Sequence, residues 1–327
     1  SLTLNLKHPQ GRGIFFRLIE KADVLVENFR PGVMERLGLG FDKLKEINPQ
    51  LVYCAISGFG QDGPLWDSPA YDQIIQGLSG SMSVTGTDDS GPLRVGFPMS
   101  DTIGGITAAL GITASLSQPK REAVFIDVSM LESTMATMGW IISNYLSAGI
   151  DPQRMGNENF TSAPSGAFQT GSGLLNIAAN KQEQYEILCG LLERKDLVNH
   201  PDFISRELRK QHREKLKQEL EKELQQNSAA YWSKQLNQAG VPAGEVLSVP
   251  QALELQQIRE RGFLEKFEEV PGLEKPVQLV RTGIQLNGKP LSVQRPPPQL
   301  GEDTHAILKD CGYNDDEIAN FHQEKVI

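Results

Sequence analysis

The chain has 327 residues, too many for one simple core, and the length predicts two domains or one large domain with an insertion. Apolar residues make up 39% and aromatic residues 7%, an ordinary globular composition, and no apolar run is long enough for a membrane span. The net charge of −9 argues against a nucleic-acid partner, although a few well-placed cations can still hold an anionic small molecule.

The three cysteines, Cys54, Cys189 and Cys311, share no motif spacing and cannot all pair with one another. A chain of this length can bury a core without disulfides. We therefore expect a reducing compartment, the cytoplasm, or the mitochondrial matrix if the source is eukaryotic. Cys54 lies in an apolar strand pattern, where a small buried side chain is the simplest interpretation.

The first 60 residues predict alternating strands and helices. We expect strands at 2–6, 22–27 and 51–56, and helices at 11–21, 33–37 and 42–47. Residues 1–7 already alternate like a strand inside a sheet, so we expect a further segment upstream of them. This order predicts a Rossmann-like, open, mostly parallel sheet covered on both faces. The turns at 28–32 and 57–60 leave the carboxyl ends of strands, where such sheets bind ligands.

The sequence then predicts a helix at 71–78, an apolar helix opening at Ser100 and Asp101, a strand at 125–129 and a long helix at 130–146. A linker rich in Gly, Asn, Ser and Pro follows at 149–166.

Beyond the linker the composition changes and predicts a smaller α/β domain, with a strand at 174–178 and helices at 182–192, 205–225 and 229–239. The proline-rich run at 295–301 predicts an extended link, and helices at 303–311 and 315–322 could pack back on the first domain. We expect a large ligand-binding domain of residues 1–160 and 295–327, a small domain of residues 165–265, and a return segment of residues 266–294.

Several common catalytic constellations are missing from the sequence. None of the five histidines lies between residues 9 and 199, and no Cys/His cluster has zinc spacing. No Gly-x-Gly-x-x-Gly motif follows a strand and no P-loop occurs. Functions that depend on nicotinamide, on nucleotide hydrolysis or on zinc therefore lose support.

Asp101 is a carboxylate at the start of the apolar helix. The helix dipole and free N–H groups there favour its ionised form. Gly104 and Gly105 would let a ligand or another backbone approach closely, so Asp101 could be a nucleophile. A simple helix cap is the alternative, and position alone favours it.

Five motifs run in order along nearly the whole chain. They are VENFRPGVMERLGL at 26–39, NPQLVYCAISGFGQDGP at 48–64, PAYDQIIQGLSG at 69–80, IDVSMLE at 126–132 and RPPPQLGEDT at 295–304. This set resembles the class III coenzyme A-transferase family, the CaiB/BaiF type. That family includes formyl-CoA and carnitine CoA-transferases and also 2-methylacyl-CoA racemases.

The resemblance implies a set of site residues. The family's catalytic aspartate falls on Asp101 in the run MSDTIGG. Contacts to coenzyme A fall on five positions, and two further residues would flank the pocket. The five are Leu4, Lys7, Asn28, Phe29 and Arg36, and the flanking pair is Tyr71 and Asp72.

Physical chemistry is compatible with these roles. Lys7 and Arg36 can pair with phosphates, and Phe29 offers an apolar surface to the adenine or the pantetheine arm. For Arg36 the alternative is a surface ion pair with a neighbouring glutamate, and for Tyr71 it is a half-buried core aromatic.

The resemblance further implies that coenzyme A moves from an acyl-CoA thioester to a small carboxylic acid, such as oxalate or succinate. Asp101 would carry a mixed anhydride and then an aspartyl-CoA thioester. Coenzyme A is a substrate in this scheme, and the resemblance implies that neither a metal site nor a prosthetic group is needed. The family also implies an interlocked, ring-like homodimer, and no nucleic-acid or membrane partner is expected.

Two other functions stay open. A racemase moves an α-proton, and members of that branch carry a histidine just before the residue that matches Asp72, where this chain has Tyr71. A non-catalytic acyl-CoA-binding protein is the alternative from another class, and the retention of Asp101 beside the CoA-contact residues argues against it.

Overall fold

The computed structural model describes all 327 residues, and they form two compact units. The first unit contains Ser1–Arg154, Lys266–Leu279 and Ser292–Ile327, and the second contains Met155–Glu265 and Val280–Leu291. The 266–294 segment is thus shared between the units. That the larger unit binds the ligand stays a prediction.

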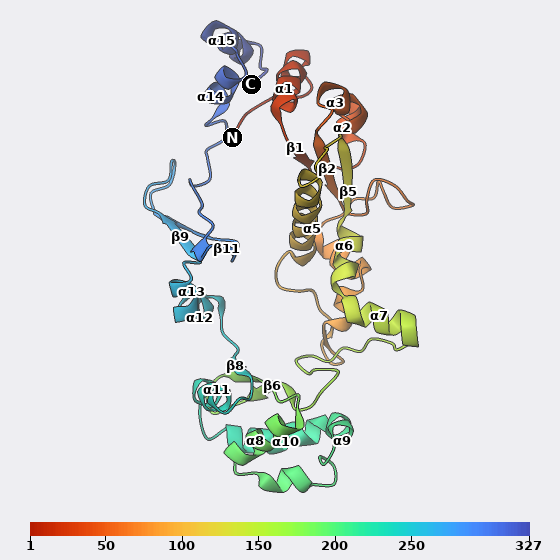
Figure 1. The fold of residues 1–327 in the computed structure, drawn as a ribbon, viewed down its shortest axis with the longest axis vertical. Helices are drawn as coiled ribbons and strands as arrows, with labels where there is room; N and C mark the ends of the chain where they lie inside the picture. The colour runs from red at the N-terminus through yellow and green to blue at the C-terminus, as the bar shows by residue number, and fades with distance from the viewer. The chain divides into compact units, whose positions relative to one another are not determined.

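The first unit is built on a three-stranded sheet with the order β1-β2-β5 (Figure 1). Strands β1 (Val24–Glu27), β2 (Val52–Ser57) and β5 (Val124–Ser129) all run parallel. Parallel neighbours need helical crossovers, and these are present between each pair. The expectation of a mixed α/β chain with a parallel sheet is confirmed.

Helices cover both faces of this sheet. Helices α1 (Pro9–Lys21) and α3 (Phe41–Ile47) pack on one face, where Ile19 and Leu44 meet Tyr53 of β2. Helix α5 (Met99–Leu116) packs on the other face, where Ala108 meets Cys54 and Val128. Side chains alternate between the faces of a strand, so a strand covered on both sides carries buried side chains on both faces, as β2 does from Val52 to Ala55.

The last two helices complete this unit. Helices α14 (Thr304–Asp310) and α15 (Asp315–Gln323) place Leu308, Ile318 and Phe321 against Ile14 of α1. The remaining elements of the unit are α2 (Val33–Arg36), α4 (Asp72–Leu78), a 3₁₀ turn (Ser81–Val84), β3 (Gly86–Thr87), β4 (Gly91–Pro92), α6 (Met130–Thr137) and α7 (Gly139–Ala148).

The second unit has an antiparallel sheet of β6 (Ser165–Gln169), β7 (Leu174–Ala178) and β8 (Ala243–Glu245). Its core joins this sheet to the helices around it, through residues such as Phe168, Leu175, Tyr185, Leu220 and Leu236. The helices are α8 (Gln182–Leu191), a 3₁₀ turn (Lys195–Asn199), α9 (Arg206–Gln211), α10 (Arg213–Leu224) and α11 (Ala229–Gln238). The following segment contains α12 (Val249–Leu253), α13 (Gln256–Glu260), β9 (Leu264–Phe267), β10 (Val277–Val280), β11 (Gln285–Leu286) and β12 (Lys289–Pro290).

Three expected elements differ in the structure. The strand expected at 2–6 is irregular, because its backbone bonds to the C-terminal segment, as in Asn5 N–H to the Val326 carbonyl (2.8 Å), and not to a neighbouring strand. The helix expected at 130–146 breaks before Gly139, whose φ is +29°. The helix expected at 205–225 breaks at His212. No helix has both the length and the apolar character to cross a membrane.

Candidate active site

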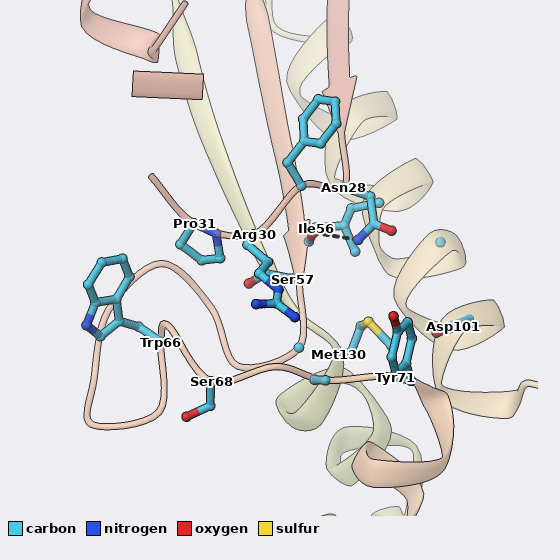
Figure 2. Close-up of a pocket in the computed structure, with 14 residues that line it drawn as sticks. Asn28, Arg30, Pro31, Ile56, Ser57, Trp66, Ser68, Tyr71, Asp101 and Met130 are labelled. Carbon is cyan, nitrogen blue, oxygen red and sulfur yellow. Dashed lines mark hydrogen bonds between the residues drawn. The ribbon is translucent and has the colours of Figure 1, made fainter. Parts of the chain in front are cut away.

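A pocket of about 440 Å³ lies at the carboxyl edge of the β1-β2-β5 sheet (Figure 2). Residues that follow all three strands line it: Asn28 to Pro31 after β1, Ile56 to Gly58 at the end of β2, and Met130 after β5. Trp66, Ser68, Ala70 and Tyr71 add a loop wall, and Asp101 and Gly105 add the first turns of α5. This is where open parallel sheets bind ligands, as the two turns in the sequence predicted.

Hydrogen bonds hold the two strand-exit turns. The Asn28 side-chain amide donates to the Ile56 carbonyl at 2.7 Å and ties the exit of β1 to that of β2. The Phe29 N–H donates to Glu27 Oε2 at 2.7 Å, and burial is the main cause that raises the pKa of this carboxyl. The backbone that enters the pocket is therefore fixed on both sides of Asn28.

The turn after β2 is held from β5. Asp127 Oδ2 accepts the Gln61 N–H at 2.9 Å, and Ser57 Oγ accepts the Gly60 N–H at 3.0 Å. Gly60 has φ +90°, which a residue with a side chain rarely adopts. A Cβ on Gly58 would lie 2.4 Å from the Ala70 Cβ, so glycine is required for the loop wall to pack against the end of β2.

Asp101 is the third residue of α5 and reaches the pocket with a solvent-accessible carboxylate. In Figure 2, Tyr71 and Asp101 lie on one side of the pocket and Trp66 on the other. Partial enclosure raises the pKa of the Asp101 carboxyl, and the negative charge of Asp72 raises it further. The sequence predicted that the helix start favours the ionised form, but the pKa of Asp101 moves in the opposite direction, chiefly because the carboxyl is partly buried and then because Asp72 places a second negative charge beside it.

The expected site residues fall into two groups. Asn28, Phe29, Tyr71 and Asp101 line the pocket, whereas the other four lie outside its wall. Leu4 packs with the cluster of α1, α14 and α15, Lys7 is exposed just before α1, and Arg36 is exposed on α2. Asp72 is buried beneath the first turn of α5.

Sequence reasoning did not single out several lining side chains. Arg30 lies in the turn after β1, and its guanidinium is directed into the pocket in Figure 2. Met130 follows the β5 strand directly, so the strand-exit rule could have found it. Trp66 and Ser68 belong to an irregular loop, where no spacing signal exists.

The fold and the pocket define an α/β protein with a cavity at the strand exits and a carboxylate in its wall. A family model described as CoA-transferase family III matches residues 1–304. An acetyl-CoA:oxalate CoA-transferase of Acetobacter aceti is 36% identical over 321 residues, 95% of this chain and 79% of the relative. A succinyl-CoA:glutarate CoA-transferase of Homo sapiens is 30% identical over 318 residues, 97% and 72% of the two chains.

A solved structure agrees with these matches. The crystal structure of a CaiB/BaiF family protein from Brucella suis superposes with a TM-score of 0.84 at 31% identity, over 95% of this chain and 81% of that one. The chain belongs to CoA-transferase family III and is a transferase.

Proposed function

We propose that this enzyme moves coenzyme A from an acyl-CoA to a small carboxylic acid through a covalent intermediate on Asp101. The observation that supports this most directly is the accessible Asp101 carboxylate in a pocket formed by all three strand exits. The relatives named above act on acetyl-CoA and oxalate and on succinyl-CoA and glutarate, so we propose acceptors of that class, small mono- or dicarboxylates.

The proposed reaction balances without an external proton donor. An Asp101 oxygen attacks the thioester carbonyl carbon, the C–S bond breaks, and the CoA thiolate leaves a mixed anhydride behind. The thiolate then attacks the Asp101 carbonyl carbon and releases the donor acid as its carboxylate. The acceptor carboxylate next attacks the aspartyl carbonyl carbon, the C–S bond breaks, and the expelled thiolate leaves a second mixed anhydride behind. The thiolate finally attacks the acceptor carbonyl carbon of this anhydride, forms the acceptor acyl-CoA and releases Asp101 as its carboxylate. Covalent catalysis thus divides one difficult exchange between anions into four acyl transfers.

We propose that coenzyme A binds along the wall of the pocket that contains Asp101. Asn28 and Phe29 line the pocket, and Arg30 adds a cation to it that can meet a phosphate or a carboxylate. Lys7 and Arg36 lie outside the pocket wall, where they could meet the more distant phosphates of a long ligand. We therefore keep both residues, with Leu4 and Tyr71, in the proposed CoA-binding set.

Trapping the intermediate tests this function. After incubation with acetyl-CoA or succinyl-CoA, we expect intact mass spectrometry to show an adduct, and hydroxylamine to convert it to a hydroxamate on the peptide that contains Asp101. Measurable CoA binding without any adduct, across several acyl-CoAs, would contradict the transferase mechanism and favour a binding protein.

We also propose that the enzyme is a homodimer. Helix α7 buries none of its residues within the chain, and Tyr145 and Leu146 are 52% and 76% exposed. On α5, Ile106 and Leu110 are also exposed, at 65% and 71%. Apolar surface of this extent is typical of an interface between chains. Sedimentation equilibrium is expected to give twice the chain mass, and a monomer at micromolar concentration would argue against the dimer.

A further inference from the structure

The first turn of α5 is capped by a residue of another helix. The Asp72 Oδ1 atom accepts the Ser100 N–H at 2.7 Å and the Asp101 N–H at 3.3 Å. The residue before the helix, Pro98, provides no capping side chain. Free N–H groups at a helix start need an acceptor, and here Asp72, at the start of α4, supplies it.

A buried glutamine completes this arrangement. Gln76 is fully buried, and its Nε2 donates to Asp72 Oδ2 at 2.7 Å and to the Phe97 carbonyl at 3.3 Å. Its Oε1 accepts the Val95 N–H at 2.8 Å. The amide therefore orients the Asp72 carboxylate and ties α4 to the chain that leads into α5. A polar network satisfied in this way holds one geometry.

The consequence for Asp101 is twofold. Its own backbone N–H and that of Ser100 are bound to Asp72, so they are not available to a carboxylate at this helix start. The Asp101 carboxylate accepts no hydrogen bond from the chain, and the charge of Asp72 contributes to its raised pKa. A carboxylate without such bonds is a better nucleophile than one neutralised by helix N–H groups.

We propose that Asp72 is a positioning residue for the nucleophile: it fixes the first turn of α5 against α4 and occupies the helix N–H groups, so that the Asp101 oxygens stay free to attack. This inference rests on the proposed function of Asp101. Asp72 itself is buried and does not line the pocket.

Few other charges bear on Asp101. Arg30 and Tyr71 share the pocket with it, from the turn after β1 and the residue before α4. From the elements beneath α5, Ile56 of β2 and Met130 of α6 approach Gly104, and neither carries a charge. The Asp72 carboxylate is therefore the negative group whose removal should change the ionisation of Asp101 most.

The test separates the cap from its charge with two variants. Asp72→Ala removes both the oxygen that accepts the helix N–H groups and the negative charge. The double variant Asp72→Asn with Gln76→Glu keeps, at position 72, an oxygen that accepts the Ser100 and Asp101 N–H groups. The new carboxylate at position 76 accepts a hydrogen bond from the new amide at position 72. The negative charge is thereby moved from position 72, which caps the helix, to position 76. Asp89→Asn removes an exposed charge from the same unit and serves as the control.

The measurement is the rate of adduct formation on the Asp101 peptide from pH 4 to pH 9, with acetyl-CoA in single turnover. For Asp72→Ala we expect a loss of about a hundredfold at neutral pH, where Asp101 is ionised in both proteins, which is the scale of a misplaced reacting group. For the double variant we expect the fall of the rate at acid pH to move down by about one pH unit, because Asp101 then ionises more readily. Circular dichroism and CoA affinity confirm that each variant is folded.

The possible outcomes distinguish the role proposed for Asp72 from the proposed function of Asp101. A wild-type enzyme that forms no adduct on Asp101 would overturn the proposed function, and this inference with it. A wild-type adduct together with a folded Asp72→Ala variant that reacts within threefold of it, or a double variant with an unmoved acid limb, would overturn the inference alone.

Discussion

Replacing Asp101 by asparagine is expected to reduce the rate of CoA transfer by about four orders of magnitude or more, the scale on which the loss of a covalent nucleophile acts. The amide has nearly the same shape as the carboxylate but cannot attack a thioester carbon. Because Asp101 is one of 14 residues around the pocket, coenzyme A should still bind with an affinity within a few fold of wild type. Steady-state transfer from succinyl-CoA and calorimetric titration with CoA measure the two quantities.

Asp101→Glu is the matched control for this prediction. It keeps the charge, but its extra methylene displaces the carboxylate from the first turn of α5, so we expect partial activity. In the wild-type enzyme, activity should fall as the pH drops through the raised pKa of Asp101, because only the ionised carboxylate attacks. Retention of more than one per cent of the activity by the asparagine variant would show that another group carries the intermediate.

Replacing Arg209 by alanine is expected to destabilise the second unit by about 3–5 kcal/mol, as for a large buried side chain that also leaves polar partners unbonded. Arg209 is 2% exposed. Its guanidinium donates to the Ala163 carbonyl at 3.1 Å and to the Phe203 carbonyl at 3.0 Å, and lies 4.2 Å from the ring centre of Tyr185. Burial lowers the pKa of this guanidinium.

Amide hydrogen exchange along a urea series measures this loss in peptides from the second unit, since a chain with two units need not unfold in one step. Arg206→Ala is the control on the same helix. Arg206 is exposed and also donates to a carbonyl, that of Thr161. We expect the Arg206→Ala variant to leave amide hydrogen exchange in the second unit unchanged. Equal exchange in both alanine variants would mean that the buried guanidinium does not stabilise the unit.

Much of the large unit can be predicted from the sequence, because its signals are local. The apolar runs that became β1, β2 and β5, and the turns after the first two, follow from hydrophobic pattern and turn residues. These local signals place the turn at 28–32 at a strand exit, whereas the family motifs assigned Asn28 and Phe29 within it to the site. The family motifs added Tyr71 and raised Asp101 above a simple helix cap.

The missed features depend on residues far apart in the chain. Asp101 and its capping residue are 29 positions apart, so the sequence could not show that the helix start was already occupied. The alternation at residues 2–6 was read as a strand, but the segment has no strand beside it. The break at Gly139 requires a positive φ that the apolar pattern of the helix does not reveal.

Helix α1 and the helices that complete its core, α14 and α15, stand at opposite ends of the chain, and this separation affects biosynthesis. At a translation rate of about 5–20 residues per second, Leu308 leaves the ribosome tens of seconds after Ile14, its partner in the core. During that time Ile14 on α1 lacks the partners that α14 and α15 later provide. The second unit forms its sheet within 165–245 and can fold while the nascent chain is still growing. In the order of synthesis, the unit that contains Asp101 is thus completed last.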